Sequence, residues 1–397
     1  MFDAEAFVNG QIPELRRVIG GGKALIACSG GVDSTVSAVL THRAIGGNLI
    51  CIFIDDNFMR LDEPKNVAKL LSDPPLNLPI RIIDVRNRFM KALGGLTDAE
   101  EKRKAFRETF YQVLGEVAKK EGCRFLVQGT IAPDVIETKG GVKTQHNVLA
   151  QIGINPVEKF GFQVVEPVLS LYKPQVREVA RYLGVPPAIS ERQPFCGPGL
   201  SVRCVGKIKL DKLETVREAT AIVEEELSGR NIQQYFAAII DSAPMEDPAA
   251  TKLRILTSRF LRLFLAQVNV QVLKSKATGV KKGKRLYGKI ALISAETATG
   301  NIYKPQIENL IQLSSKLVEE TPTFIRVLYK LTEKPRKKPY LIAIRAITTQ
   351  DFVTAKVAQI DWVTLTEIAR QIMSRCPDVS AVYYDLTNKP VATIEFE

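Results

Sequence analysis

The stretch KALIACSGGVDSTVSAVL, residues 23–40, limits what this chain can fold into more than any other stretch. The apolar run at 23–28 predicts a buried strand, and the pattern from Val32 to Ala44 predicts a helix directly after it. Two glycines in the connecting turn permit positive φ angles and a close approach of the backbone. A strand, glycine turn and helix in this order direct several backbone N–H groups at one point, so we expect an anion-binding site.

The composition of this turn excludes two common nucleotide loops. It lacks the Gly-Lys-Ser/Thr ending of a Walker A motif, and its glycines do not have GxGxxG spacing. Ser29, Ser34 and Thr35 add hydroxyl donors, whereas Asp33 would repel a bare phosphate. We therefore expect Asp33 to hold a metal ion or to cap the helix. The alternative interpretation is an ordinary helix-capping turn. The six-residue order SGGVDS directly after a buried strand makes that interpretation less favourable.

Strand and helix patterns alternate through the first half of the chain. Buried strands are predicted at 48–55, 79–85 and 124–130, with helices at 63–71 and 97–122. This alternation predicts an α/β fold with a parallel, doubly wound sheet. Ligands of such sheets bind beyond the carboxyl ends of the strands, where Ser29–Ser34, Asp55 and Gly129–Asp134 all fall. We expect these residues to form one common site.

The pattern changes in the second half of the chain. Residues 133–162 are rich in glycine, charge and amides, which is typical of a functional or disordered segment. Residues 191–206 are rich in Pro and Gly and indicate a domain boundary. We expect a first domain at 1–192 with a lid at about 134–162, and a smaller α+β domain at 193–397. A strand pair formed by 381–387 and 391–397 is expected at its end.

The charge of the chain favours an anionic ligand. There are 55 Lys and Arg residues against 43 Asp and Glu, a net charge of +12. Basic residues gather at 281–285 and 334–338, but no RNA-binding motif accompanies them, so nucleic acid is a less favoured partner than a phosphorylated small molecule. Six scattered cysteines and two histidines disfavour a structural zinc site or a disulfide framework. No apolar run approaches a membrane span and no secretory leader is recognisable, so we expect a cytoplasmic protein without a membrane partner.

The SGGVDS turn resembles the pyrophosphate-binding loop of the PP-loop ATP pyrophosphatases, which cleave ATP between the α- and β-phosphates. Four further stretches, at 128–137, 143–148, 192–203 and 389–397, resemble the GMP synthetase family over nearly the whole chain. The similarity is closest to the archaeal type, in which the ATP pyrophosphatase half is a separate polypeptide. It implies that ATP and Mg²⁺ adenylate XMP, that ammonia from a separate glutamine amidotransferase subunit then gives GMP, and that the C-terminal domain forms a homodimer.

The resemblance also implies roles for individual residues. The ATP-binding set is Ser29, Gly30, Gly31, Val32, Asp33, Ser34, Asp55, Phe58 and Gly129, with Asp33 and Asp134 as metal ligands. The catalytic set is Asp134 together with the lid residues Glu137, Lys143 and His146. The XMP-binding set is Pro198, Gly199, Lys276, Arg345, Lys389, Ile394 and Glu395.

The chain departs from the family pattern at several points. Cys196 and Val391 replace prolines, which loosens the backbone because proline fixes φ. Residues of about 242–275 and 294–340 are expected to be insertions, which would extend the dimer interface or dock a glutaminase partner. The main alternative function is sulfur transfer or tRNA modification by a PP-loop enzyme, with Cys196 or Cys204 as sulfur carrier. A catalytically silent regulatory subunit is a second alternative.

Overall fold

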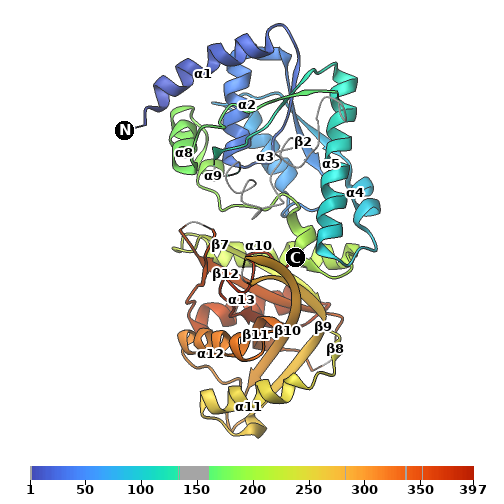
Figure 1. Ribbon diagram of the computed structural model, residues 1–397, viewed down its shortest axis with the longest axis vertical. Coiled ribbons are helices and arrows are strands. Elements are labelled where there is room, and N and C mark those ends of the chain that lie inside the picture. Colours follow the sequence, from blue (N-terminus) through green and yellow to red (C-terminus); the bar gives the residue numbers. More distant parts are fainter. Residues whose placement is uncertain (1, 133, 135–160, 282, 336–337, 351) are drawn as a thin grey trace. The chain divides into compact units, whose positions relative to one another are not determined.

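The computed structural model describes residues 2–132, 134, 161–281, 283–335, 338–350 and 352–397. The chain forms two compact units. The first contains Met1–Leu93 and Arg103–Pro198, and the second contains Gly94–Lys102 and Gly199–Glu397. Each unit has its own β-sheet (Figure 1).

The first unit is built on a parallel sheet, which has five strands among the described residues, in the order β3-β2-β1-β4-β5. The strands are β1 (Ala24–Ala27), β2 (Leu49–Asp55), β3 (Ile80–Asp84), β4 (Phe125–Val127) and β5 (Gln163–Val165). The helices are α1 (Ala4–Ile19), α2 (Val32–Ile45), η1 (Gly46–Asn48), α3 (Glu63–Ser72), α4 (Arg86–Leu93), α5 (Ala99–Glu121), α8 (Lys173–Tyr182) and α9 (Pro187–Ser190). This confirms the predicted doubly wound sheet. The strand order reverses between β1 and β4, where such sheets bind ligands.

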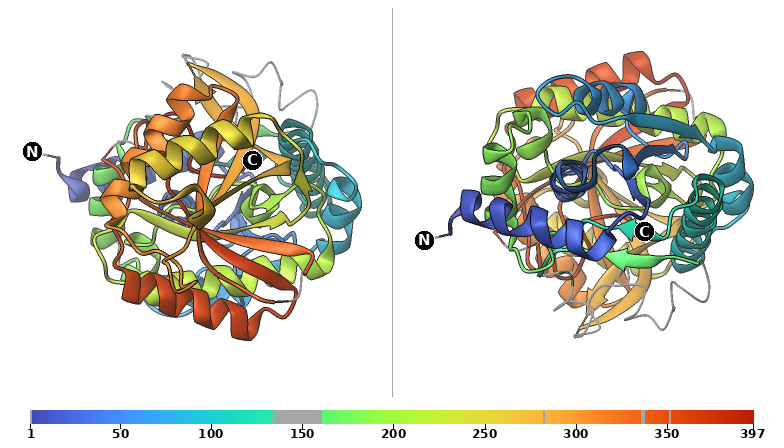
Figure 2. Two further views of the ribbon diagram at one scale, coloured as in Figure 1. Left: turned by 90° about the horizontal axis from the view of Figure 1, so that it is seen from below. Right: turned by 90° about the horizontal axis from the view of Figure 1, so that it is seen from above.

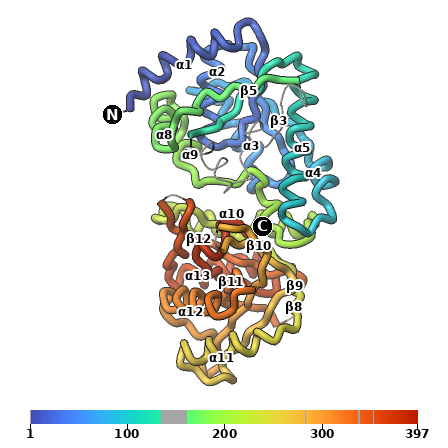
Figure 3. Tube along the Cα trace, viewed as in Figure 1, coloured from blue at the N-terminus to red at the C-terminus, as the bar shows by residue number. Residues whose placement is uncertain are grey.

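Successive residues of β1 are buried on alternate sides, which shows that both faces of this sheet are covered. Ala24 and Ile26 of β1 belong to a buried cluster to which α1, α2, α3 and α8 contribute, and α1 and α8 lie side by side (Figure 3). Leu25 is also fully buried, and its side chain points to the opposite face because successive residues of a strand alternate. A strand buried on both faces is a continuous apolar run, which is the pattern of residues 24–27.

The second unit is built on a mixed sheet, which has nine strands among the described residues. Its order is β6-β7-β12-β14-β11-β10-β9-β8, and β13 pairs with β12. The strands are β6 (Cys204–Val205), β7 (Gln234–Asp241), β8 (Pro244–Met245), β9 (Val268–Lys281), β10 (Lys284–Ala295), β11 (Phe324–Glu333), β12 (Tyr340–Thr348), β13 (Lys356–Val357) and β14 (Val379–Asp385). The helices are η3 (Gly199–Val202), α10 (Leu210–Leu227), α11 (Ala249–Leu261), η4 (Leu265–Gln267), α12 (Ile307–Glu320) and α13 (Trp362–Arg375).

Helices cover one face of this second sheet, and the last residues of the chain cover part of the other. Helices α10, α12 and α13 contact the sheet strands, and α11 lies beside α12 (Figure 2). Phe396 is fully buried in a cluster with residues of β7, β9, β10, β11, β12 and β14, and Val391 and Ile394 pack against that cluster. No helix in the described ranges combines the length and the apolar character that a bilayer crossing requires.

Of the two strands predicted at the end of the chain, 381–387 and 391–397, the second is wrong. β14 forms as predicted, but residues 391–397 are not a strand. Ala392 forms an isolated bridge with Gly279, and the N–H groups of Thr278 and Val280 donate to the carbonyls of Phe396 and Val391. The reason lies in the hydrogen bonds of this segment, because arginine side chains bind the carbonyls of Thr393 and Glu395 that a neighbouring strand would otherwise take.

Candidate phosphate and nucleotide sites

The glycine turn after β1 is shaped by its own hydroxyl groups. Ser34 Oγ donates to the carbonyl of Gly31 at 3.0 Å and lies 3.1 Å from Ser29 Oγ. Gly30 has φ +76°, and a Cβ there would lie 2.7 Å from a methyl group of Val67. No side chain in the described ranges caps α2, so its first N–H groups remain available for an anion.

Asp33 and Lys173 form an ion pair at this turn. Lys173 Nζ, at the start of α8, lies 2.5 Å from Asp33 Oδ2. Asp33 Oδ1 is buried and has no hydrogen-bond partner among the residues that the structure describes. The ammonium group of Lys173 could therefore bind a phosphate at this turn. The unused Oδ1 of Asp33 could bind a metal cation.

Gly129 brings the end of β4 against the beginning of α2. A Cβ on Gly129 would lie 2.7 Å from both the carbonyl carbon of Asp33 and the backbone nitrogen of Ser34. Side chains essentially never approach a backbone this closely, so a residue without a side chain is needed here. The structure thus unites Gly129 with the SGGVDS turn, as the strand-end rule predicted.

The residues after β2 are buried rather than open. Phe58 is fully buried, and its ring centroid lies 6.3 Å from that of Phe106. Asp55 Oδ1 accepts a hydrogen bond from the backbone N–H of Asn57 at 3.3 Å. Asp56 is 1% exposed and its Oδ1 accepts the N–H of Phe58 at 2.7 Å. Burial raises the pKa of Asp56 to about 7, and the negative charges of Asp55 and Glu63 add to this effect.

This buried carboxyl group predicts a pH dependence of stability. The pKa of Asp56 is about 7 in the folded protein and 3.8 for an unperturbed carboxyl. At a pH between these two values, the Asp56 carboxyl is protonated in the folded state and ionised in the unfolded state. The contribution of Asp56 to stability therefore falls as pH rises through this window and stays constant above it. Relative to Asp56→Asn, the wild type should lose up to about 4 kcal/mol of unfolding free energy between about pH 4 and pH 7. Urea unfolding of both proteins across this range measures the difference, and parallel pH profiles would contradict it.

Arg192 and Phe195 anchor the start of the stretch 191–206 beside the glycine turn. Arg192 Nη2 lies 2.7 Å from Glu63 Oε1, at the start of α3. Arg60 pairs with the same carboxylate at 3.4 Å, and its guanidinium carbon lies 4.1 Å from the ring centroid of Phe195. A Cβ on Gly30 would lie 3.4 Å from Arg192 Nη1, so this guanidinium lies close to the turn.

Asp134 closes the turn that follows β4. Its Oδ2 accepts the N–H of Ile131 at 3.0 Å, and the residue is 9% exposed. The remaining catalytic candidates, Glu137, Lys143 and His146, lie outside the described residues, as does most of the expected lid at 134–162.

The candidates for the second nucleotide are spread over both units. Pro198 is the last residue of the first unit, and Gly199 begins the second with φ +58°. Lys276 is an exposed residue of β9. Lys389 Nζ donates to the carbonyl of Phe352 at 2.5 Å, and Ile394 is half-buried.

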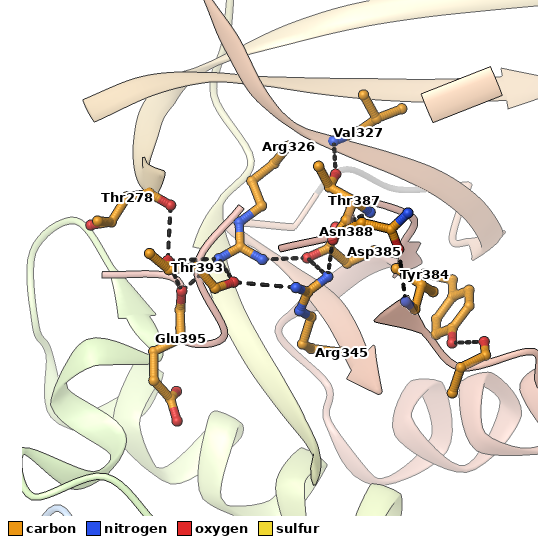
Figure 4. A network of polar contacts seen from close by, with 12 residues as sticks. Thr278, Arg326, Val327, Arg345, Tyr384, Asp385, Thr387, Asn388, Thr393 and Glu395 are labelled. Carbon is orange, nitrogen blue, oxygen red and sulfur yellow. Dashed lines mark hydrogen bonds and ion pairs between the residues drawn. The ribbon is translucent and has the colours of Figure 1, made fainter. Parts of the chain in front are cut away.

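Buried arginines hold the last residues of the chain in place (Figure 4). Arg326 and Arg345 are fully buried and share the carboxylate of Asp385, with Nη1–Oδ2 distances of 2.6 Å and 3.2 Å. Both guanidiniums donate to the carbonyl of Thr393, at 2.8 Å and 3.2 Å. The two terminal nitrogens of Arg345 are therefore bound to the protein itself, whereas its buried Nε has no hydrogen-bond partner among the described residues. Separately, Arg203 forms two hydrogen bonds of 2.9 Å to the carboxylate of Glu395.

Sequence reasoning missed several of these residues. Lys173 carried a usable signal, because it begins the helix after β5 and so belongs to the same sheet edge as the glycine turn. Arg203 lies in the Pro/Gly-rich stretch 191–206 and Arg326 in the expected insertion at about 294–340, so only their partners identify them.

The first unit and its turn define the class of the protein, an α/β protein with a parallel sheet and a glycine-rich turn between β1 and α2. The family model of the GMP synthase C-terminal domain matches residues 336–396. A glutamine-hydrolyzing GMP synthase subunit of Sulfurisphaera tokodaii is 43% identical over 396 residues, with 100% of both chains covered. The corresponding subunit of Methanopyrus kandleri is 40% identical over 397 residues, also with 100% of both chains covered. Among solved structures, NMN synthetase from Francisella tularensis aligns at a TM-score of 0.39 and 19% identity, covering 50% of this chain and 78% of that chain. The full-length identities show that this chain belongs to the same family of GMP synthase subunits, which confirms the resemblance.

Proposed function

We propose that this chain is the ATP pyrophosphatase subunit of a GMP synthase. It transfers AMP from ATP to the C2 oxygen of XMP and then lets ammonia replace the AMP, which yields GMP, AMP and pyrophosphate. The observation that carries this proposal is the SGGVDS turn with its Asp33–Lys173 pair, in a chain related over its whole length to GMP synthase subunits.

The first step needs stabilisation of the leaving group. The C2 oxygen of XMP forms a bond to the α-phosphorus of ATP, and the bond from that phosphorus to the bridging oxygen of the β-phosphate breaks. Pyrophosphate then carries the developing negative charge. The N–H groups at the start of α2 and the ammonium group of Lys173 lie at one turn, where they would hold this charge.

The second step needs ammonia at C2 of the purine. Ammonia forms the new C2–N bond, the bond from C2 to the oxygen of AMP breaks, and the nitrogen releases its surplus protons. Water would hydrolyse the adenylated intermediate, so a cover over the site is required. Glu137, Lys143 and His146 remain the proposed cover residues from the family pattern.

The turn is suited to a magnesium ion. Asp33 Oδ1 is a buried carboxylate oxygen without a hydrogen-bond partner in the described part of the chain, and a hard cation prefers such a ligand. No group of three or more His, Cys, Asp or Glu side chains suited to a metal occurs in the described ranges, so phosphate oxygens and water would complete the shell. Asp134 is the second proposed ligand. When bound, Mg²⁺ would neutralise part of the negative charge of the phosphates.

XMP would be held by residues at the unit boundary and in the second unit. The backbone N–H of Gly199, which follows Pro198, would bind its phosphate together with the exposed Lys276 of a neighbouring subunit, and Lys389, Ile394 and Glu395 would contact the purine. Arg345 would act through the carbonyl groups that it binds rather than on XMP itself. We further propose a homodimer through the second unit and a separate glutamine amidotransferase subunit as ammonia source. Use of ATP and six cysteines, none of them in a disulfide, favour the cytoplasm.

Sulfur transfer is less favoured than this function. Cys204 is fully buried, and burial raises its pKa to about 12, so at neutral pH it is a thiol rather than a nucleophilic thiolate. Cys196 is half-buried, but no CxxC pair in the sequence would resolve a persulfide on it.

A direct assay tests the proposed function. The pure protein with ATP, Mg²⁺, XMP and ammonium should form AMP and GMP in equal amounts, and omission of XMP should abolish AMP formation. Glutamine should not replace ammonium until a second, glutamine-hydrolysing protein is added. ATP cleavage that requires tRNA and is indifferent to XMP would contradict the proposal.

A further inference from the structure

We propose that Lys102 is a positioning residue for XMP, because it ties the last residues of the chain to the segment at 199–206. The inference rests on the proposed function, which assigns parts of the XMP site to both segments. Lys102 and both segments belong to the second unit.

Lys102 uses its ammonium group entirely within the protein. The residue is fully buried, although it lies in the first turn of α5. Its Nζ donates to the carbonyl of Cys204 at 2.8 Å, to that of Gly206 at 2.5 Å, and to the carboxylate of Glu397. An ammonium group has three donors, so these three acceptors satisfy it.

Glu397 is bound to the same segment from its other side. It is 1% exposed, its Oε1 accepts the N–H of Gly206 at 2.8 Å, and its backbone N–H donates to the carbonyl of Val202 at 3.0 Å. Burial raises the pKa of the Glu397 carboxyl, and the charge of Lys102 opposes this shift. A buried carboxylate of this kind is costly without its cation.

The two residues before Glu397 have different kinds of partner. Phe396 is fully buried in the apolar cluster on the sheet. Glu395 is held by Arg203, and Gln234 Nε2 donates to its Oε1 at 3.2 Å. The last residues are thus attached at Glu395 and at Glu397, and both attachments lead to residues 203–206.

The partners of Lys102 indicate how its loss would affect XMP binding. Without Lys102, the buried carboxylate of Glu397 loses the cation that contacts it. The segment at 389–397 would still be attached through Arg203 and Arg326 but would be positioned less precisely, so Lys389 and Glu395 would shift. Because Lys102 contacts protein acceptors rather than the site of ATP chemistry, we expect its loss to raise the KM for XMP more than it lowers kcat.

The test compares Lys102→Met, Glu397→Gln and the double variant. In Lys102→Met, amide hydrogen exchange of 386–397 should accelerate in the nucleotide-free protein, and the KM for XMP should rise about tenfold or more, with the KM for ATP changed less than about twofold. The double variant should recover part of the affinity, because it also removes the buried negative charge of Glu397. Unchanged exchange at 386–397 together with an unchanged KM for XMP would overturn the proposal.

Lys212→Met is the matched control. Lys212 is also fully buried and binds the neighbouring carbonyl of Val205 at 2.6 Å, but its carboxylate partner is Asp241, at 2.9 Å. The charge of Lys212 also acts on Glu397, but more weakly than that of Lys102, so this variant should lose stability with a smaller increase of exchange at 386–397 than Lys102→Met shows. If Lys102→Met does not fold, Glu397→Gln alone decides the question, because it keeps the side-chain shape.

The two proposals can fail separately. If the wild type neither binds XMP nor forms GMP, the proposed function is wrong, whereas hydrogen exchange in the nucleotide-free variants still tests the anchor. If XMP supports turnover but Lys102→Met changes only global stability, the function stands and the positioning role is wrong.

Discussion

Replacing Gly129 by alanine should lower XMP-dependent AMP formation about 100-fold or more. The added Cβ would lie 2.7 Å from two backbone atoms at the Asp33–Ser34 junction, and backbone cannot rotate away as a flexible side chain can. Either the end of β4 or the glycine turn must therefore move. A displacement of even about 1 Å at groups that stabilise a transition state is enough for a rate effect of this size.

The control for this prediction is Gly47→Ala in the same unit. Gly47 does not have a positive φ, and a Cβ there would meet nothing within 4 Å, so turnover should stay near that of the wild type. Steady-state release of AMP measures both variants, and circular dichroism reports whether each is folded. A folded Gly129→Ala protein with normal turnover would show that the glycine turn is not where pyrophosphate leaves.

Replacing Asp385 by asparagine should lower the free energy of unfolding by about 3–5 kcal/mol. Asp385 is fully buried and is shared by Arg326 and Arg345, which are fully buried themselves. Asparagine keeps the shape but removes the charge, so two guanidiniums would remain in the interior without this anion. Burial already lowers the pKa of Arg326 to about 10, which is still high enough to keep it charged at neutral pH.

Urea unfolding of the wild type and of Asp385→Asn measures this loss. Glu14→Gln serves as the control, because Glu14 pairs with Arg17 on the surface, where an ion pair contributes little. It should give an unfolding curve that matches the wild type. If Asp385→Asn does so too, the arginine pair is neutralised by other groups, and the account of how the last residues are held fails.

Patterns along the chain were sufficient for the first sheet and its turn. β1 and β2 appear as short apolar runs because both faces of a parallel sheet are buried, and the glycine turn could be placed because strand and helix patterns flank it directly. The strand-end rule also placed Gly129 beside this turn, since carboxyl ends of parallel strands share one edge.

The same patterns failed where partners come from distant parts of the chain. Residues 391–397 read as a strand by composition, yet Arg326 binds their carbonyls and Phe396 packs on the sheet face. The residue types of this segment were read correctly, but their partners were not visible in the sequence.

The sequence by itself determined the parallel sheet, the position of the glycine turn and the family, because periodicity and short motifs are local properties of the chain. Only the tertiary structure decided that Lys173 meets Asp33, that Lys102 meets Glu397 and that two arginines share Asp385. Charged side chains of this kind carry no periodic signal. Their roles are set by burial and by the opposite charge that the fold brings to them, which for Lys102 lies 295 residues further along the chain.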